Sequence, residues 1–119
     1  MTATVASCYH PRPMTDARRG PTYDLSTIKR LVGEGRYHVT GQALDGLGEL
    51  DFDRTDVVAC IMQLGRHCFH RTMSAERAPG PWQDVYRPIH CGIALCVKLQ
   101  IANRLGGLSL AVVVSFKRK

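Results

Sequence analysis

The amino-acid sequence predicts an α+β fold, with two or three N-terminal helices packed on one face of a single antiparallel β-sheet. Two observations lead to this prediction. Apolar residues recur at helical spacing up to about residue 65, and from Arg66 onward they alternate with the two-residue period of strands. Glycine and proline residues separate the strand-like segments, as expected for antiparallel strands that follow one another. The 119 residues suit one domain of this class.

The first helix is predicted over residues 23–34. Asp24 or Ser26 can cap its start, because their side chains accept hydrogen bonds from free backbone N–H groups. Its apolar positions recur at helical spacing, and glycines follow its last turn. Residues 37–39 are predicted to be a short extended segment.

Two more helices are predicted before the strands begin. Thr40 caps a brief helix that is expected to end at Gly48. Asp53 caps the next one, with Asp56 at the capping-box position and Gly65 at its end. The buried stripe of this helix is predicted to consist of Val57, Val58, Ile61, Met62 and Leu64.

Four strands are predicted in the second half of the chain, over residues 68–74, 82–87, 90–101 and 108–117. Turns are predicted at 78–81 and 103–107, where proline and glycine gather. On the third strand the residues predicted to share the inward face are Ile93, Leu95, Val97, Leu99 and Ile101. On the fourth they are Leu108, Leu110, Val112, Val114 and Phe116.

Composition bounds the class of protein. No apolar stretch reaches the roughly 20 residues of a membrane-spanning helix, and no secretory signal is recognised at the start. The five cysteines form no Cys-x-x-Cys pair, so reduced thiols in a cytoplasmic protein are expected, with Cys60 as a core residue. Residues 1–20 show no apolar period and are predicted to be a flexible extension, which leaves the domain at 21–119.

The charge is unevenly distributed along the chain. The whole sequence carries a net charge of +6, but residues 41–60 are acidic. Residues 61–119 contain nine lysines and arginines against two acidic residues. A basic half of this kind suits a polyanion such as RNA, and it is equally compatible with a basic surface that only keeps a protein in solution.

Strand parity predicts a polar face on the sheet. Cys96, Lys98 and Gln100 alternate with the inward residues of the third strand, and Ser115 and Lys117 do so on the fourth. On the second strand Gln83 and Arg87 share a face, and on the first Phe69 and Arg71 would share one. Paired strands would bring these side chains onto one basic, open face.

Two segments carry a specific resemblance to a known family. They are Trp-Gln-Asp-Val-Tyr-Arg-Pro at 82–88 and Val-Ser-Phe-Lys at 114–117. With matching pieces at 25–32, 50–53 and 69–73, the chain from about residue 21 to 119 resembles the MqsR toxins, ribonucleases of type II toxin–antitoxin systems. The resemblance implies a RelE-like fold.

The resemblance also implies an activity and a partner. Members of the family cleave mRNA, at GCU-like triplets, without a cofactor. Their partner is an MqsA-type antitoxin that contains zinc and a DNA-binding helix-turn-helix domain. The family is linked to growth arrest, persistence and biofilm regulation.

The family's proposed active residues are carried over one at a time. A lysine after Phe-Tyr falls on Arg71, which keeps the charge, and the tyrosine before it falls on His70. The glutamine after tryptophan falls on Gln83, and the lysine near the C-terminus falls on Lys117. A tyrosine on the third strand falls on Cys96, so the phenol is lost.

Chemistry assigns expected roles to these residues. When the 2′-hydroxyl of RNA attacks the adjacent phosphate, the enzyme must accept a proton, stabilise negative charge and protonate the leaving oxygen. Cations such as Lys117 and Arg71 suit the second task, and Gln83 can orient the ribose or phosphate. His70 and Tyr86 are the candidates for proton transfer. The residues expected to bind RNA are Lys98, Arg87, Cys96 and Arg118.

Two other functions fit the sequence. The loss of the family tyrosine at Cys96 suits an RNA- or antitoxin-binding module with weakened catalysis. A small zinc-binding protein is the other alternative, with candidate ligands at His67, Cys68, His70, His90, Cys91 and Cys96. Their spacing matches no standard zinc motif, so no metal site is assigned.

Overall fold

The computed structural model describes residues 20–74, 81–103 and 108–119. The predicted extension, up to residue 19, lies outside these ranges. So do most residues of the turns predicted at 78–81 and 103–107.

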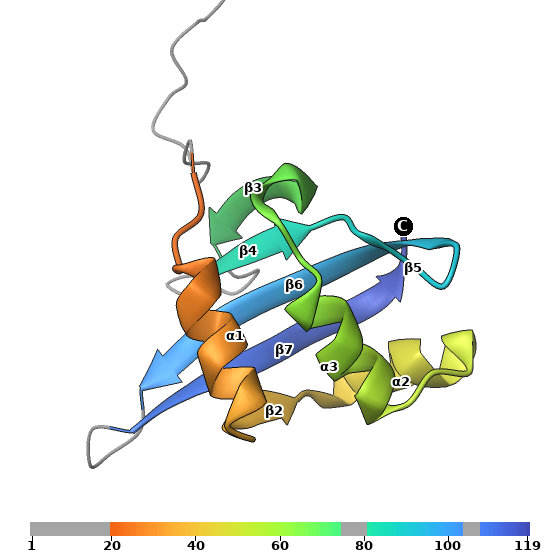
Figure 1. The fold of residues 1–119 in the computed structure, drawn as a ribbon, viewed down its shortest axis with the longest axis horizontal. Coiled ribbons are helices and arrows are strands. Elements are labelled where there is room, and N and C mark those ends of the chain that lie inside the picture. Colours follow the sequence, from red (N-terminus) through yellow and green to blue (C-terminus); the bar gives the residue numbers. More distant parts are fainter. Residues whose placement is uncertain (1–19, 75–80, 104–107) are drawn as a thin grey trace, which may run out of the picture.

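Three helices cover a mostly antiparallel sheet, which confirms the predicted α+β class and agrees with a RelE-like arrangement (Figure 1). The helices are α1 (Leu25–Gly33), α2 (Gly41–Leu50) and α3 (Arg54–Met62). The strands are β2 (Tyr37–Val39), β3 (Phe69–Ser74), β4 (Trp82–Tyr86), β5 (Ile89–His90), β6 (Ile93–Asn103) and β7 (Ser109–Arg118). The sheet order is β2-β7-β6-β4-β3, and β5 pairs with β6. Among the strand pairs of the described residues, β2–β7 is parallel and the others are antiparallel.

The helix starts follow the predicted caps. Asp24 accepts from the Thr27 amide, and Thr40 caps α2. Asp53 and Asp56 form the complete capping box of α3. The predicted end of α2 at Gly48 is wrong. The helix runs two residues further, to Leu50, and Asp51 ends it in the left-handed region at φ 61°.

The core lies between the helices and one face of the sheet. Its largest buried side chains include Ile28, Ile61, Leu95 and Phe116, each at most 1 % exposed. The predicted place of Met62 in the buried stripe is wrong, because its side chain is 40 % exposed and Cys60 occupies the buried position instead. None of the helices in the described residues is long and apolar enough to cross a membrane.

A β-bulge in β7 reverses the predicted parity of that strand. Lys98 pairs with Ser115 and Leu99 pairs with Val113, so Val114 has no partner in the ladder. Ala111 and Val113 therefore face the core, while Leu110 and Val112 lie on the other face, with Ala102 and Gln100 as their partners on β6. The prediction that Leu110 and Val112 face inward is wrong, because strict alternation holds only in an unbroken ladder. Leu108 was also predicted to face inward, but it precedes β7 and is 60 % exposed. Val114, the fourth of these residues, is the extra residue of the bulge.

The predicted third strand is divided in two. A tight turn at Cys91 and Gly92, both at positive φ, separates β5 from β6. His90 pairs with Ile93 across this turn. Downstream of the turn the predicted inward face is confirmed, since Leu95, Val97 and Leu99 are fully buried.

A buried carboxylate joins the start of the domain to the sheet. Asp84 on β4 is fully buried and accepts hydrogen bonds from the backbone N–H groups of Thr22, at 2.9 Å, and Tyr23, at 2.8 Å. The hydroxyl of Thr22 also bonds that of Thr72 on β3, at 2.7 Å. These contacts fix the chain just before α1, at the predicted beginning of the domain.

Candidate nucleic-acid interface

The sheet face opposite the core carries most of the predicted site residues. We call it the outer face. Strand register places its side chains in rows that cross the sheet. One row contains Cys96 and Lys117, which are direct partners, and the pairing of Tyr86 with Val97 puts Arg87 beside Cys96. The next row contains Arg71, Val85, Lys98 and Ser115.

These two rows bring together four positive charges, on β3, β6 and β7 and at the residue directly after β4. We refer to Arg71, Arg87, Lys98 and Lys117 as the cationic face. Between them lie small or apolar side chains: Val85 and Ser115 are buried, and Cys96 is half-buried. Arg87 and Lys117 lie on either side of Cys96. Because neighbouring strands are about 4.8 Å apart, the backbones of these two residues are about 10 Å apart. Side chains of this length can grip one phosphate from both sides.

A second bulge places His70 beside the cationic face. The register of β3 against β4 shifts between Phe69 and Arg71, so His70 is an extra residue in the strand. The sequence-based parity, which put Phe69 and Arg71 on one face, is therefore wrong. Phe69 instead packs edge-on against the buried ring of Tyr86, and Arg71 remains exposed on the outer face.

The electrostatics of His70 agree with this placement. The pKa of its imidazole is lowered from its ordinary value, first by desolvation and then by three positive charges, those of Arg87, Arg71 and Lys119. The His70 side chain is exposed. The ring is therefore mainly neutral near pH 7 and has a free nitrogen that can accept a proton.

Gln83 occupies the far end of the outer face. Its row contains Met73, Gln100 and Val112, and its amide nitrogen donates to the Gln100 side chain at 3.2 Å. Along β6 this row is four residues from that of Lys117, which amounts to roughly 16 Å between the two backbones. Gln83 and Lys117 can therefore contact one RNA strand, but at different nucleotides.

Two predicted site residues lie away from the cationic face. Tyr86 is on the core face, 1 % exposed, and burial raises its pKa to about 12. Its hydroxyl is buried without a hydrogen-bond partner in the described residues. Arg118 pairs with Leu95, a core residue, so its side chain leaves the strand on the helix side. We therefore leave Tyr86 and Arg118 out of the proposed site.

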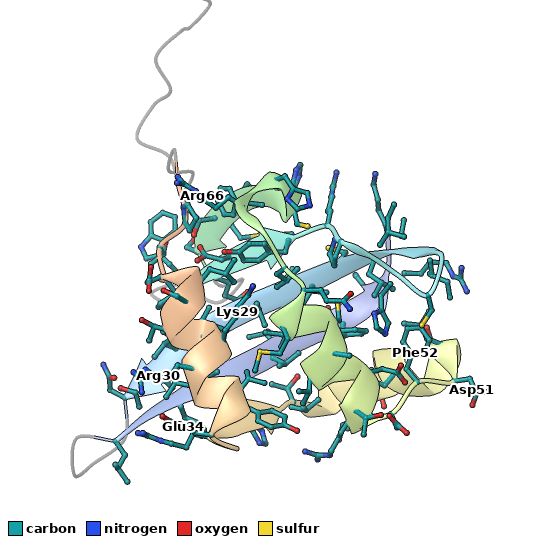
Figure 2. The ribbon with its side chains drawn as sticks, in the orientation of Figure 1. Lys29, Arg30, Glu34, Asp51, Phe52 and Arg66 are labelled. Atoms are coloured by element: carbon teal, nitrogen blue, oxygen red, sulfur yellow. The ribbon has the colours of Figure 1, made fainter. Side chains whose placement is uncertain are left out.

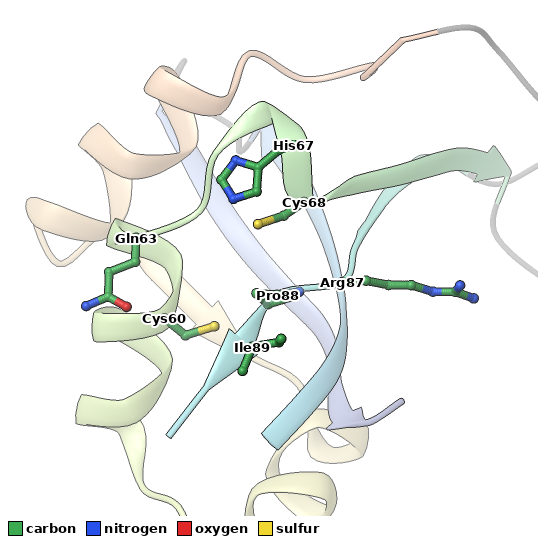
Figure 3. A pocket seen from close by; sticks show the side chains of 7 residues that line it. All are labelled: Cys60, Gln63, His67, Cys68, Arg87, Pro88 and Ile89. Carbon is green, nitrogen blue, oxygen red and sulfur yellow. The ribbon is translucent and has the colours of Figure 1, made fainter. Parts of the chain in front are cut away.

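The six candidate zinc ligands separate into three groups. His67 and Cys68 line a cavity of about 260 Å³ that also contains the Cys60 side chain (Figure 3). His70 and Cys96 belong to the outer face. His90 and Cys91 lie together, and with them lies Asp56, which the sequence assigned only to a helix cap. In Figure 3 the Arg87 side chain extends away from the cavity.

Sequence reasoning missed two contributors to the interface. Lys119 lies close enough to influence His70, and its backbone N–H bonds the Ala94 carbonyl at 2.9 Å. Gln100 was noted only as a polar residue, and its side-chain oxygen accepts a hydrogen bond from the amide nitrogen of Gln83. Both relations depend on strand register, which the sequence alone does not fix.

Comparison with known proteins gives two matches. Residues 20–118 match the family described as the motility quorum-sensing regulator, toxin of MqsA. The chain is also 31 % identical over 102 residues to the mRNA interferase toxin MqsR of Escherichia coli strain K12. That match covers 86 % of this chain and 98 % of the relative.

Proposed function

The chain belongs to the family of MqsR toxins, and from this premise we propose that it cleaves mRNA as the toxin of a toxin–antitoxin pair. The substrate is single-stranded mRNA cut at GCU-like triplets in the cytoplasm, which stops translation and growth. The observation that carries the proposal is the cationic face, where Arg71, Arg87, Lys98 and Lys117 lie together in two rows. A polyanion is the natural ligand of such a surface.

The proposed reaction uses the 2′-hydroxyl of the RNA as nucleophile. Its oxygen forms a bond to the adjacent phosphorus while the bond from phosphorus to the 5′-oxygen breaks. The 5′-oxygen leaves with the electron pair of that bond and takes a proton from water. The products are a 2′,3′-cyclic phosphate and a 5′-hydroxyl. Negative charge builds on the phosphorane oxygens, and Lys117 and Arg87 can hold those oxygens from both sides of Cys96. Because this charge exists only in the transition state, their contribution is to the rate.

We assign proton removal to His70. Its neutral imidazole can accept the proton of the 2′-hydroxyl, and the surrounding arginines favour this neutral form. Arg71, directly after it, is exposed and can bind the phosphate that follows along the strand. Gln83 and Gln100 offer amide groups to a base or ribose further along the outer face.

The direct test is cleavage by the purified full-length chain in the presence of EDTA. A single-stranded RNA with one GCU triplet is expected to be cut once. Polynucleotide kinase is expected to label the new 5′ end without phosphatase treatment, since that end carries a hydroxyl. Products with 5′-phosphates, or cleavage that requires added Mg²⁺, would contradict the proposed chemistry.

The His70→Gln variant tests the proposed base. A base is active when deprotonated, so cleavage in the wild type should fall as pH decreases through the pKa of His70. Since that pKa is lowered, the acidic limb is expected below pH 6.5. The variant should lose this limb and about 10²-fold in cleavage rate at pH 7. An unchanged acidic limb in the pH–rate profile of His70→Gln would show that another group accepts the proton.

The proposed partner is an MqsA-type antitoxin with bound zinc and a helix-turn-helix domain. The description of the matching family, toxin of MqsA, supports this partner. Growth arrest on expression of the chain should be relieved when the antitoxin from the same operon is co-expressed. Arrest that persists beside a stably co-expressed antitoxin would argue against the pairing.

The second candidate function is an RNA- or antitoxin-binding module with weakened catalysis. It is favoured by one observation: Cys96, where the family has tyrosine, lies in the middle of the Arg87–Lys117 row. Binding of GCU-containing RNA without cleavage would support it. A thiol is a weak hydrogen-bond donor, so it replaces a phenol poorly.

The Cys96→Tyr variant separates the two functions. A phenol between Arg87 and Lys117 would restore a donor at the phosphate, and the cleavage rate is expected to rise by roughly tenfold or more. Cys96→Phe is the matched control, because it adds the ring without the hydroxyl. Equal rates for Cys96→Tyr, Cys96→Phe and wild type would show that position 96 makes no catalytic contact.

A further inference from the structure

Three metal-ligating side chains lie together at the corner where α3 meets the β5–β6 turn. They are Asp56 of α3, His90 of β5 and Cys91 of the turn. Their ligand atoms, a carboxylate oxygen, a ring nitrogen and a thiol sulfur, all lie within 4.8 Å of one another. None of the three has a part in the proposed cleavage of RNA.

The spacing of this cluster approaches that of a zinc site. His90 Nε2 and Asp56 Oδ1 are 3.2 Å apart. In a tetrahedral site with zinc bonds of about 2.1 Å to nitrogen and oxygen, two such ligands are about 3.4 Å apart. A zinc-bound sulfur, at about 2.3 Å from the ion, would lie about 3.6 Å from the other two ligand atoms, so it needs a shift of little more than about 1 Å from the present separation of up to 4.8 Å. Cys91 is exposed at a turn, where rotation of its side chain can supply this shift.

The surroundings hold two of the three ligands in place. His90 is 8 % exposed, and its ring packs perpendicular to that of Phe52, with ring centroids 5.5 Å apart. Figure 2 shows Phe52 in the segment that joins α2 to α3. The second carboxylate oxygen of Asp56 accepts from the Asp53 amide, at 3.0 Å, which leaves Oδ1 directed to His90. In known metal sites, neighbouring groups such as the Asp53 amide orient the side chains that bind the metal.

The third ligand occupies an unusual backbone position. Cys91 has φ 53°, in the left-handed region, where glycine, asparagine and aspartate are preferred. Its neighbour Gly92 is also at positive φ, so the turn is of the tight kind that rarely accepts cysteine. From this position the Cys91 sulfur lies within 4.8 Å of the ligand atoms of Asp56 and His90.

We propose that Asp56, His90 and Cys91 bind one Zn²⁺ ion that links α3 to the β5–β6 turn. The mixture of carboxylate, imidazole and thiol favours zinc over magnesium or calcium, and a fourth position remains for water. Binding converts the thiol to a thiolate and releases its proton. The ion stabilises the fold at the start of β6, the strand that carries Cys96 and Lys98.

The test is zinc titration of the full-length chain after dialysis against EDTA. Native mass spectrometry is expected to show one bound Zn²⁺ per chain. The melting temperature should rise by about 10 °C when free zinc is a hundredfold above its Kd. With Co²⁺ as a spectroscopic probe, a thiolate-to-cobalt charge-transfer band should appear.

Variants assign the site without depending on ribonuclease activity. Cys91→Gly should abolish the cobalt band and the zinc-induced shift in melting temperature, while the metal-free protein becomes more stable because glycine relieves the left-handed backbone. Asp56→Asn should weaken zinc binding at least tenfold. Cys68→Ser is the matched control, since Cys68 lies outside the cluster, and it should bind zinc as the wild type does. Loss of binding in Cys68→Ser but not in Cys91→Gly, or no binding by the wild type, would overturn the proposal.

Discussion

Lys117→Ala is expected to lower the rate of RNA cleavage by about 10³-fold, the effect of removing one charge that stabilises a transition state. Lys117 is exposed at the end of β7 and faces Cys96, so no core contact is lost. The melting temperature should stay within about 2 °C of the wild type, because exposed substitutions rarely change stability by more than 0.5 kcal/mol. Cleavage is measured on the single-GCU RNA in EDTA.

A matched lysine separates the local role of Lys117 from net charge. Lys29 lies on α1, on the helix side of the molecule (Figure 2). Lys29→Ala removes the same charge and should leave cleavage within about twofold of the wild type. Lys117→Arg keeps a positive charge and should retain part of the activity. Wild-type rates in Lys117→Ala would remove this residue from the proposed site.

Gly46→Ala is expected to destabilise the fold by about 3 kcal/mol or more. Gly46 lies in α2, where it faces β7, and a methyl group there would lie 1.9 Å from the carbonyl oxygen of Phe116. That oxygen belongs to the backbone of β7, where Phe116 pairs with Val97 of β6, so the strand cannot move away from the helix without disturbing the sheet. The melting temperature should fall by more than about 10 °C, as measured by calorimetry.

Gly48 provides the control two residues further along the same helix. A methyl group at Gly48 would meet nothing within 4 Å. Alanine is a better helix former than glycine by about 1 kcal/mol, so Gly48→Ala should raise the melting temperature by a few degrees. If both variants were stabilised, the close approach of α2 to β7 would be refuted.

Local signals in the sequence predicted the elements well. The caps at Asp24, Thr40 and Asp53 mark the helix starts, because a cap depends on one side chain and its nearest backbone. The end of α2 was missed because Gly48 is a tolerated interior glycine, and the chain turns only at Asp51. No local feature of the sequence shows whether Gly48 ends the helix or lies inside it.

Features that depend on pairing between strands could not be predicted from the sequence. The bulges at His70 and Val114 have no marker glycine, and each reverses which side chains share a face. As a result, Leu110 and Val112 were assigned to the core, and Phe69 was placed beside Arg71. The shared face of Lys98 and Lys117 was predicted correctly because both lie on the same side of the Val114 bulge as Cys96.

The sheet order has a consequence for synthesis on the ribosome. β7 lies between β2 and β6, so the earlier strand β2 has no partner in the described sheet until β7 has been translated. A nascent chain that ends before β7 lacks Phe116 of the core and Lys117 of the cationic face. The proposed nuclease therefore cannot become active before the ribosome has translated β7.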